Sequence, residues 1–257
     1  MKTKLITFAV FLCAFRIYSQ ETARVDLASG KITFEEKVKL EIKLEGDAAA
    51  LAANLPKERK TEKLLSFTRD ASLFEELKTV DEDMSSNQEG GVKIRMVVGG
   101  QSKIFTDLKN QKVIEQRDFM NRMFLVEKPL PAMNWKITGN QKVILGYPCM
   151  EASRLDTAGV KTTVWFAPSL TIKSGPSGFC NLPGMVLEAD INNGSRLYTA
   201  KSIEPVPGDK LKLQRPKEGK SVSETEFKEI VAAKMKEMGI ENGGQGGGTQ
   251  MHVIIKR

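Results

Sequence analysis

Residues 31–44, KITFEEKVKLEIKL, alternate apolar and polar positions almost without a break. Period-two alternation of this length is typical of a long antiparallel strand that buries one face. Glu36 is the single polar residue on the apolar side. The buried face would carry Ile32, Phe34, Val38, Leu40, Ile42 and Leu44.

Further segments with strand composition follow along the chain. They cover residues 63–67, 92–98, 103–107, 112–117 and 118–126. Tight turns predict four hairpins, which pair 103–107 with 112–117, 135–138 with 142–145, 149–155 with 160–166, and 185–191 with 196–203. So many strands joined by short turns predict a mainly β fold. We expect an antiparallel meander that forms a strongly curved sheet, a half-barrel or a barrel.

One clear helix is predicted near the end of the chain, over residues 221–240. Ser223 followed by Glu226 forms a capping-box pattern at its start. Its apolar face would carry Phe227, Ile230, Val231, Lys234 and Met238 at helical spacing. We expect this amphipathic helix to dock on the sheet, and a membrane surface or a partner helix is the alternative.

Three other segments complete the predicted plan. Residues 47–54 suggest a short alanine-rich connector. Residues 241–257 read as a Gly-rich linker and tail, and the final MHVIIKR would form an edge strand or a docking peptide. The β-rich domain is expected over residues 20–220.

The first nineteen residues have the pattern of a secretory signal peptide. Two lysines precede an apolar core over residues 5–15, and Ile17-Tyr18-Ser19 form an acceptable cleavage site. Bulky residues precede Cys13, which argues against a lipid anchor. Since no later stretch approaches ~20 apolar residues, we expect an exported protein that does not span the membrane and that is periplasmic or outer-membrane-associated.

Export changes the meaning of charge and of cysteine. The formal net charge of +7 falls to +4 in the mature chain, with 36 basic against 32 acidic residues. These charges are mixed along the chain without a basic stripe, so nucleic acid is not an expected partner. Only Cys149 and Cys180 remain after cleavage. In an oxidising compartment they predict one disulfide, and two separate buried thiols are the alternative.

Several short motifs occur in order along the second half of the chain. They are WKIT (135–138), GYPC (146–149), WFAP (165–168), a Gly-Pro pair (175–176) and NLPGMVLE (181–188). In this order and spacing the chain resembles the GLPGLI family of exported proteins from Bacteroidetes-type bacteria. The resemblance implies a β-rich exported module. Because that family has no established activity, it brings no catalytic residues to carry over.

The loop around the last two motifs allows two interpretations. Its turn residues are Gly175, Pro176, Asn181, Leu182, Pro183 and Gly184. They either steer the chain from one strand into the next or form a binding loop braced by Cys180. Asn181 stands where the family has its first Gly, and Met185-Val186 replace Leu-Ile. Asn tolerates a left-handed backbone better than most residues, so we expect the turn to persist.

The residues able to perform chemistry are few. His252 is the single histidine and lies in the tail, which excludes a histidine triad with a structured base and a two-histidine zinc site. Paired carboxylates remain candidates for acid–base catalysis. They are Glu35, Glu36, Asp156, Glu188 and Asp190. No cofactor is expected.

Methionine could bind Cu(I), since thioether sulfur is a soft ligand. The candidate pairs are Met120 with Met123, Met235 with Met238, and Met251 with His252. Filling of core gaps explains methionine equally well.

Three hypotheses for function follow. The first is a non-enzymatic accessory or binding module of the envelope, which partners an outer-membrane transporter or another envelope protein, or holds an apolar ligand on the curved sheet. The second is a hydrolase that uses carboxylates, and the third is a metal-handling protein. The lack of a structured histidine favours the first.

Overall fold

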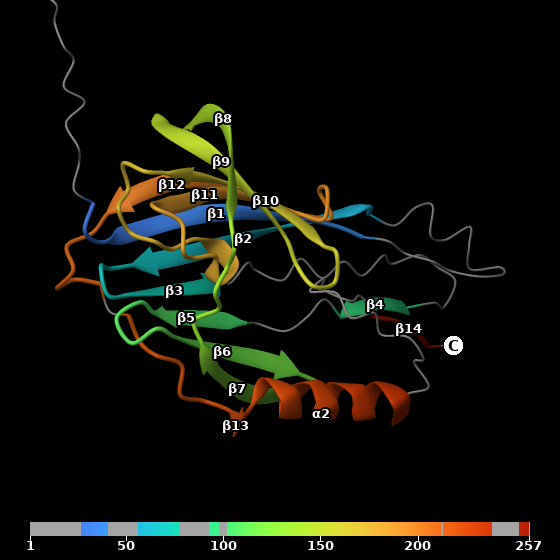
Figure 1. The fold of residues 1–257 in the computed structure, drawn as a ribbon. Helices are drawn as coiled ribbons and strands as arrows, with labels where there is room; N and C mark the ends of the chain where they lie inside the picture. Colours follow the sequence, from blue (N-terminus) through green and yellow to red (C-terminus); the bar gives the residue numbers. More distant parts are fainter. Residues whose placement is uncertain are drawn as a thin grey trace, which may run out of the picture.

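The computed structural model describes residues 27–40, 56–77, 93–97, 102–211, 213–237 and 252–256. Within these residues, twelve strands form a single curved sheet that is not closed into a barrel (Figure 1). The predicted mainly β fold with one C-terminal helix is therefore confirmed. No helix among the described residues is long and apolar enough to cross a membrane.

The sheet consists of two antiparallel meanders. The first contains β1 (Gly30–Lys39), β2 (Glu58–Phe67), β3 (Ala71–Glu76), β5 (Lys103–Asp107), β6 (Lys112–Phe119) and β7 (Arg122–Pro129). The second contains β8 (Lys136–Ile144), β9 (Tyr147–Leu155), β10 (Lys161–Ala167), β11 (Met185–Ile191) and β12 (Arg196–Pro205). Strand β12 pairs with β1 along its length and thereby joins the two halves.

Three shorter strands lie outside these meanders. Strand β13 (Lys220–Val222) adds to the sheet parallel to β7. Strand β4 (Lys93–Val97) pairs with β14 (His252–Lys256) in a separate two-stranded sheet. Residues 252–256 of the tail therefore form a strand, which was one of the two roles expected for the tail. Met238 and Met251 lie outside the described residues.

The alternating pattern of residues 31–44 is confirmed through Lys39. Ile32 and Phe34 are fully buried, and Glu36 is buried beside them as the polar exception. Residues 41–55, with the expected connector at 47–54, lie outside the described residues. Strand β3 was not predicted, because ASLFEE is too short to show a clear alternation.

The predicted hairpin between 135–138 and 142–145 is wrong. These residues form one strand, β8, which pairs with β9. The register shifts between Ile137 and Gln141, so three residues oppose Glu151 alone. The Glu151 carboxylate accepts hydrogen bonds from the Thr138 hydroxyl at 2.7 Å and the Asn140 side-chain amide at 3.3 Å. The Gly139-Asn140 pair is thus a bulge within a strand.

Helix α2 (Glu224–Glu237) docks on β7, as expected. Its capping box is confirmed: the Ser223 hydroxyl accepts from the Glu226 N–H at 3.1 Å, and the Glu226 carboxylate accepts from the Ser223 N–H at 2.6 Å. The Phe227 ring lies edge-on to Phe124 with centroids 5.4 Å apart. This contact covers the outermost apolar side chains of the sheet.

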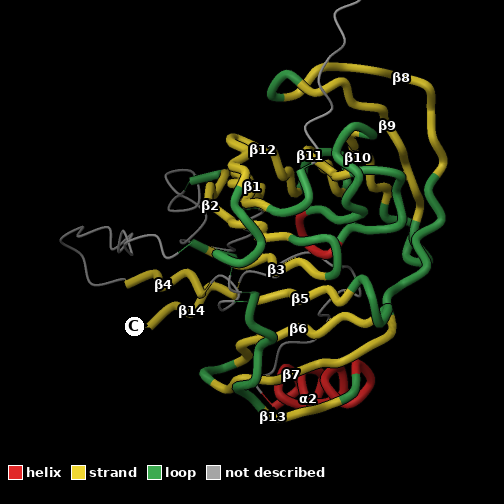
Figure 2. Tube along the Cα trace, turned by 90° about the vertical axis from the view of Figure 1, so that its left-hand side faces the viewer, coloured by secondary structure: helices red, strands yellow, loops and turns green. Residues whose placement is uncertain are grey.

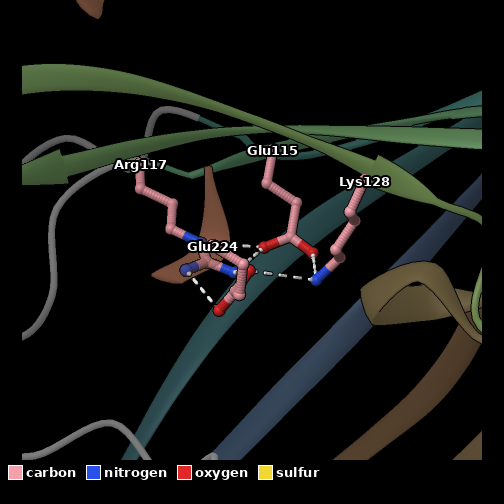
Figure 3. A network of polar contacts seen from close by, with 4 residues as sticks. All are labelled: Glu115, Arg117, Lys128 and Glu224. Atoms are coloured by element: carbon pink, nitrogen blue, oxygen red, sulfur yellow. Dashed lines mark hydrogen bonds and ion pairs between the residues drawn. The ribbon is translucent and has the colours of Figure 1, made fainter. Parts of the chain in front are cut away.

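A network of four charged residues fixes the start of α2 (Figure 3). The Arg117 guanidinium on β6 donates to Glu115 at 2.8 Å and to both oxygens of Glu224 at 3.2 and 3.1 Å. Lys128 on β7 lies 2.5 Å from Glu115 and 3.6 Å from Glu224. Two acids and two bases balance, so partial burial leaves no net charge.

The loop between β10 and β11 fills the concave side of the sheet. Its short 3₁₀ helix (Pro176–Gly178) contacts β3, β5 and β11, and in Figure 2 it lies next to β3. The Ser174 hydroxyl donates to the Ser72 hydroxyl at 2.8 Å, which ties the loop to β3. Its buried apolar side chains belong to the main core; they are Leu170, Ile172, Phe179 and Leu182. These side chains cover the concave face that the sequence suggested for an apolar ligand.

The backbone of this loop depends on particular residues. Asn181 adopts φ +65°, so the expected tolerance of Asn for the left-handed region is used here. Gly184 approaches Ala167 so closely that an added Cβ would lie 2.3 Å from the Ala167 carbonyl oxygen. Gly175 has an extended backbone, but a Cβ there would lie 2.6 Å from the Val186 Cβ.

We therefore expect Gly175→Ala to lower the free energy of unfolding by about 1–3 kcal/mol, because the added methyl overpacks the junction of loop and sheet. Gly208→Ala is the matched control, since its nearest contact would be the Ser29 hydroxyl oxygen at 3.6 Å. Urea unfolding checks the prediction. Equal stability of both variants and the wild type would contradict it.

Candidate functional site

The predicted disulfide between Cys149 and Cys180 is wrong, because both residues are free and buried. The Cys149 thiol donates to the Tyr147 carbonyl at 3.3 Å and lies near Lys142 and Glu188. The Cys180 thiol lies in the loop beside the Pro131 carbonyl and Arg154. Each sulfur therefore has different neighbours, and burial raises the pKa of each thiol to about 11.

Glu36 is the most buried of the candidate carboxylates. Its oxygens accept from the Tyr198 hydroxyl at 2.8 Å and the Thr61 hydroxyl at 2.9 Å. Lys63 lies 3.3 Å away and Arg196 lies 3.5 Å away. Burial by itself raises the pKa of Glu36, but these cations and hydroxyls outweigh it and hold the pKa below 4.5. Glu36 is thus ionised and fully occupied, which suits a structural role better than proton donation.

Two other candidate carboxylates hold turns. Asp156 accepts from the Ala158 and Val160 N–H groups at 2.9 and 2.8 Å in the β9–β10 turn. Asp190 accepts from the Gly194 N–H at 2.5 Å in the β11–β12 turn. Both turns were predicted from the sequence. Hydrogen bonding within these turns explains the two carboxylates without a catalytic role.

Trp165 on β10 lies at the centre of a row of residues that crosses the outer face of the sheet. It is paired with Glu151 of β9 on one side and with Glu188 of β11 on the other. Glu188 is paired in turn with Thr199, and Thr199 with Glu35. Directly paired residues share a face of the sheet. Two predicted carboxylates, Glu35 and Glu188, therefore lie on this face with Thr199 between them, whereas Glu36 points to the opposite face.

Lys142 connects this row to the edge strand β8. Its ammonium lies 4.3 Å from the centroid of the Trp165 ring and donates to Glu188 at 2.6 Å. The Glu188 and Lys142 side chains are 21% and 34% exposed, so solvent reaches both. We call this group the Trp165 surface. It consists of Trp165, Glu151, Glu188, Lys142, Thr138 and Asn140.

The Trp165 surface combines an aromatic ring with several polar groups. The Cα atoms of Glu151 and Glu188 are two strand spacings apart, about 9.5 Å. Carboxylates at such a separation accept hydrogen bonds from neighbouring hydroxyls of one polyhydroxylated molecule. The Lys142 ammonium already lies over the Trp165 ring, so such a molecule would meet the ammonium donors and the edge of the ring. The arrangement therefore suits a carbohydrate.

Apart from the Trp165 surface, a cleft lies where the β10–β11 loop meets the β2–β3 and β5–β6 turns. This cleft has a volume of about 420 Å³. Its lining is Arg69, Leu108, Gln111, Leu130, Thr171, Ile172, Lys173 and Asn181. The described lining residues include no carboxylate, so the cleft offers donors without an acid–base pair. Among the predicted loop residues, Asn181 alone lines it; its amide donates to the Pro131 carbonyl at 2.8 Å.

The sequence did not identify Glu151 or Lys142. The predicted hairpin of 149–155 with 160–166 contained the signal for Glu151, because its turn sets the register that places Glu151 opposite Trp165. Lys142 could not be found in this way, since the bulge at residues 138–140 changes the register of β8. Among the described residues, no group of three acidic, cysteine or histidine side chains could hold a metal ion.

Comparison with known families decides what kind of protein this is. The family model described as "N-glycanase peptide, N-terminal domain" matches residues 100–229, about half of the chain. The chain belongs to this family. The matched part of the chain runs from the start of β5 into α2 and contains the whole Trp165 surface.

Two solved structures share the fold. The structure of PNGF-II in space group P2₁ has a TM-score of 0.52 and 18% identity, and the match covers 80% of this chain and 33% of that one. The structure in space group C2 has a TM-score of 0.53 and 18% identity, with coverage of 79% and 32%. This chain thus spans about a third of the length of each. A comparison with curated proteins gave no match.

The family corrects the favoured hypothesis for function. A non-enzymatic accessory or binding module is contradicted, because the family and the similar structures are those of an N-glycanase, which is an enzyme. The resemblance to the GLPGLI family stays a prediction. Its motifs lie inside the matched region of the N-glycanase family.

The state of the cysteines can be checked directly. We expect neither thiol to react with iodoacetamide in the folded protein at pH 8, since both are buried with a pKa of about 11. Both should react after unfolding without reductant. A denatured protein that takes up no label and lacks two hydrogens by intact mass would contradict this assignment.

Glu36 should make stability depend on pH. A carboxyl group with a lowered pKa contributes stability above its unfolded value, and the contribution is lost as the pH falls through the folded pKa. We expect Glu36→Gln to cost about 3 kcal/mol at pH 7, because buried cations lose their partner. The difference from the wild type should shrink well below pH 4.5. Urea unfolding at both pH values checks this, and a difference that does not change with pH would contradict it.

Proposed function

We propose that this chain acts in the enzymatic removal of N-linked glycans from peptides. The observation that carries the proposal is the family match over residues 100–229, because that family is described as the N-terminal domain of an N-glycanase. The fold shared with PNGF-II over about four-fifths of the chain supports it. Export, as predicted from the first nineteen residues, would place the protein where glycosylated polypeptides from outside the cell arrive.

The Trp165 surface is the proposed contact for the glycan. Glu151 and Glu188 would accept hydrogen bonds from sugar hydroxyls on either side of the Trp165 ring. Glu188 holds Lys142 over the Trp165 ring, so the positions of Lys142, Glu188 and Trp165 are fixed before a sugar binds. Such preorganisation lowers the entropic cost of binding.

Removal of an intact glycan is a hydrolysis. Water adds to the side-chain amide that joins asparagine to the first sugar, and the carbon–nitrogen bond breaks. The peptide keeps an aspartate, and the glycan leaves as an amine. A peptide that carries aspartate in place of glycosylated asparagine is therefore the product to look for.

The test is incubation of the purified mature chain with an N-glycopeptide, followed by mass spectrometry of the peptide. We expect the aspartate product. Glu188→Gln should lower kcat/KM by about tenfold or more, because a charged hydrogen bond to the sugar is lost. Glu62→Gln is the matched control: Glu62 pairs with Glu35 at the far end of the same row and is exposed.

Glycopeptide that remains intact at stoichiometric protein would contradict the proposed activity. Equal activity of Glu188→Gln and the wild type would instead remove the Trp165 surface from the account and leave the activity standing.

A further inference from the structure

Strand β8 is the open edge of the sheet. The strand order ends at β8, whose neighbour is β9. Within the described part of the chain, no backbone hydrogen bond joins β8 to a segment other than β9. In Figure 1 the β8–β9 hairpin extends beyond the other strands. A free edge of this kind is a template for an added strand.

The direction of the free backbone groups follows from the hairpin. Leu145 and Gly146 have φ +51° and +82°, which is the two-residue turn of a tight hairpin. Ile144 and Tyr147 close it as a hydrogen-bonded pair, and the next pair, Val143 with Pro148, is then a non-hydrogen-bonded pair. Pro148 has no N–H to donate, which agrees with its place in a non-hydrogen-bonded pair.

Val143 and Gln141 therefore direct their N–H and C=O groups away from β9, toward the open edge. An extended backbone laid beside β8 would meet donors and acceptors at the spacing of a β ladder. The edge carries Lys136 and Lys142 but no carboxylate, and Lys142 is paired with Glu188, so its charge suits a neutral or weakly acidic peptide.

This edge is also where exposed apolar side chains collect. Most of the large hydrophobic residues that are exposed in the described structure lie on the β8–β9 hairpin. They are Val143 at 68%, Leu155 at 69%, Ile137 at 47% and Leu145 at 43%. Lysines and a bulge, both present in β8, limit unspecific pairing at a free edge, whereas exposed apolar side chains beside them favour a specific partner.

The edge is continuous with the Trp165 surface. Lys142 belongs to β8 and covers the Trp165 ring, while Thr138 and Asn140 of the β8 bulge bond to Glu151. A peptide along β8 would therefore lie directly beside the groups proposed to hold the glycan.

We propose that the open edge of β8 binds the peptide part of the N-glycosylated substrate as an added β-strand, with the attached glycan lying across β8 and β9 toward Trp165. This inference rests on the proposed function, and it names how that same site recognises the peptide. Main-chain pairing of this kind accepts many sequences.

Val143→Pro tests the proposal sharply. It removes one outward N–H without breaking a bond to β9, and proline is tolerated at edge positions whose N–H faces solvent. Val143→Thr is the matched control, because it keeps the N–H and the β-branched shape. The probes are one dye-labelled peptide with its N-glycan and the same peptide without it, measured by fluorescence anisotropy.

We expect Val143→Pro to raise Kd for both probes by about tenfold, and Val143→Thr to leave it near the wild-type value. Unchanged affinity of Val143→Pro would overturn the proposal. A second result would also overturn it. If the wild type were a dimer that Val143→Pro converts to a monomer, and the affinity for the peptide stayed unchanged, the edge would serve a second copy of the chain.

Amide hydrogen exchange of the wild-type protein keeps the test independent of the variant's folding. Peptide binding should slow exchange at Gln141 and Val143, and unchanged exchange at both would overturn the proposal. Glycosylated asparagine without flanking residues separates this inference from the proposed function. Its hydrolysis, at equal rates in the wild type and Val143→Pro, would uphold the activity whether or not the edge binds peptide.

Discussion

The contact between the β10–β11 loop and the concave face of the sheet is the interaction on which the rest of the structure depends. A sheet of this curvature presents an apolar hollow that must be covered. The chain covers it with its own loop, whose residues Phe179 and Leu182 join the main core. Gly175 and Gly184 permit this close approach, since any side chain at either position would meet the strand beneath. The loop motif is thus first a packing motif.

Closure of the concave side determines where function can lie. Glu36, the one buried carboxylate in the described part of the chain, is ionised and bonded to Tyr198 and Thr61. The outer face remains accessible, and there two bulges shape the row of side chains. One leaves Leu187 without a partner next to the Trp165–Glu188 pair, and the other turns Thr138 and Asn140 toward Glu151. Bulges commonly re-aim side chains near functional sites.

The sequence predicted those elements whose signals are local. Alternation gave the strand that begins at Gly30, a capping box gave the start of α2, and tight turns gave the hairpins around 156–159 and 192–195. Local signals failed where a distant partner decided the structure. Gly139-Asn140 has the composition of a turn, yet Glu151 from another strand makes it a bulge. The sequence allowed a disulfide between Cys149 and Cys180, but the fold buries them as two free thiols.

The candidate site shows the same division. Trp165 and Glu188 stood in segments that were correctly predicted as strands, so their faces could have been derived from the hairpin registers. The position of Lys142 required the irregular pairing of β8. Family membership lay beyond any residue pattern that was read from the sequence, and it corrected the expected class of function.

The chain contains two tryptophans, one on each side of the sheet, and this allows one measurement to test the central claim. The Trp135 indole donates to the Cys180 carbonyl of the loop at 2.9 Å, while Trp165 lies on the outer face. The measurement is an NMR titration of the two indole N–H signals with an N-glycopeptide. The account predicts a shift of the Trp165 signal and a Trp135 signal that stays in place. A shift of Trp135 alone would contradict it and would place the glycan at the loop.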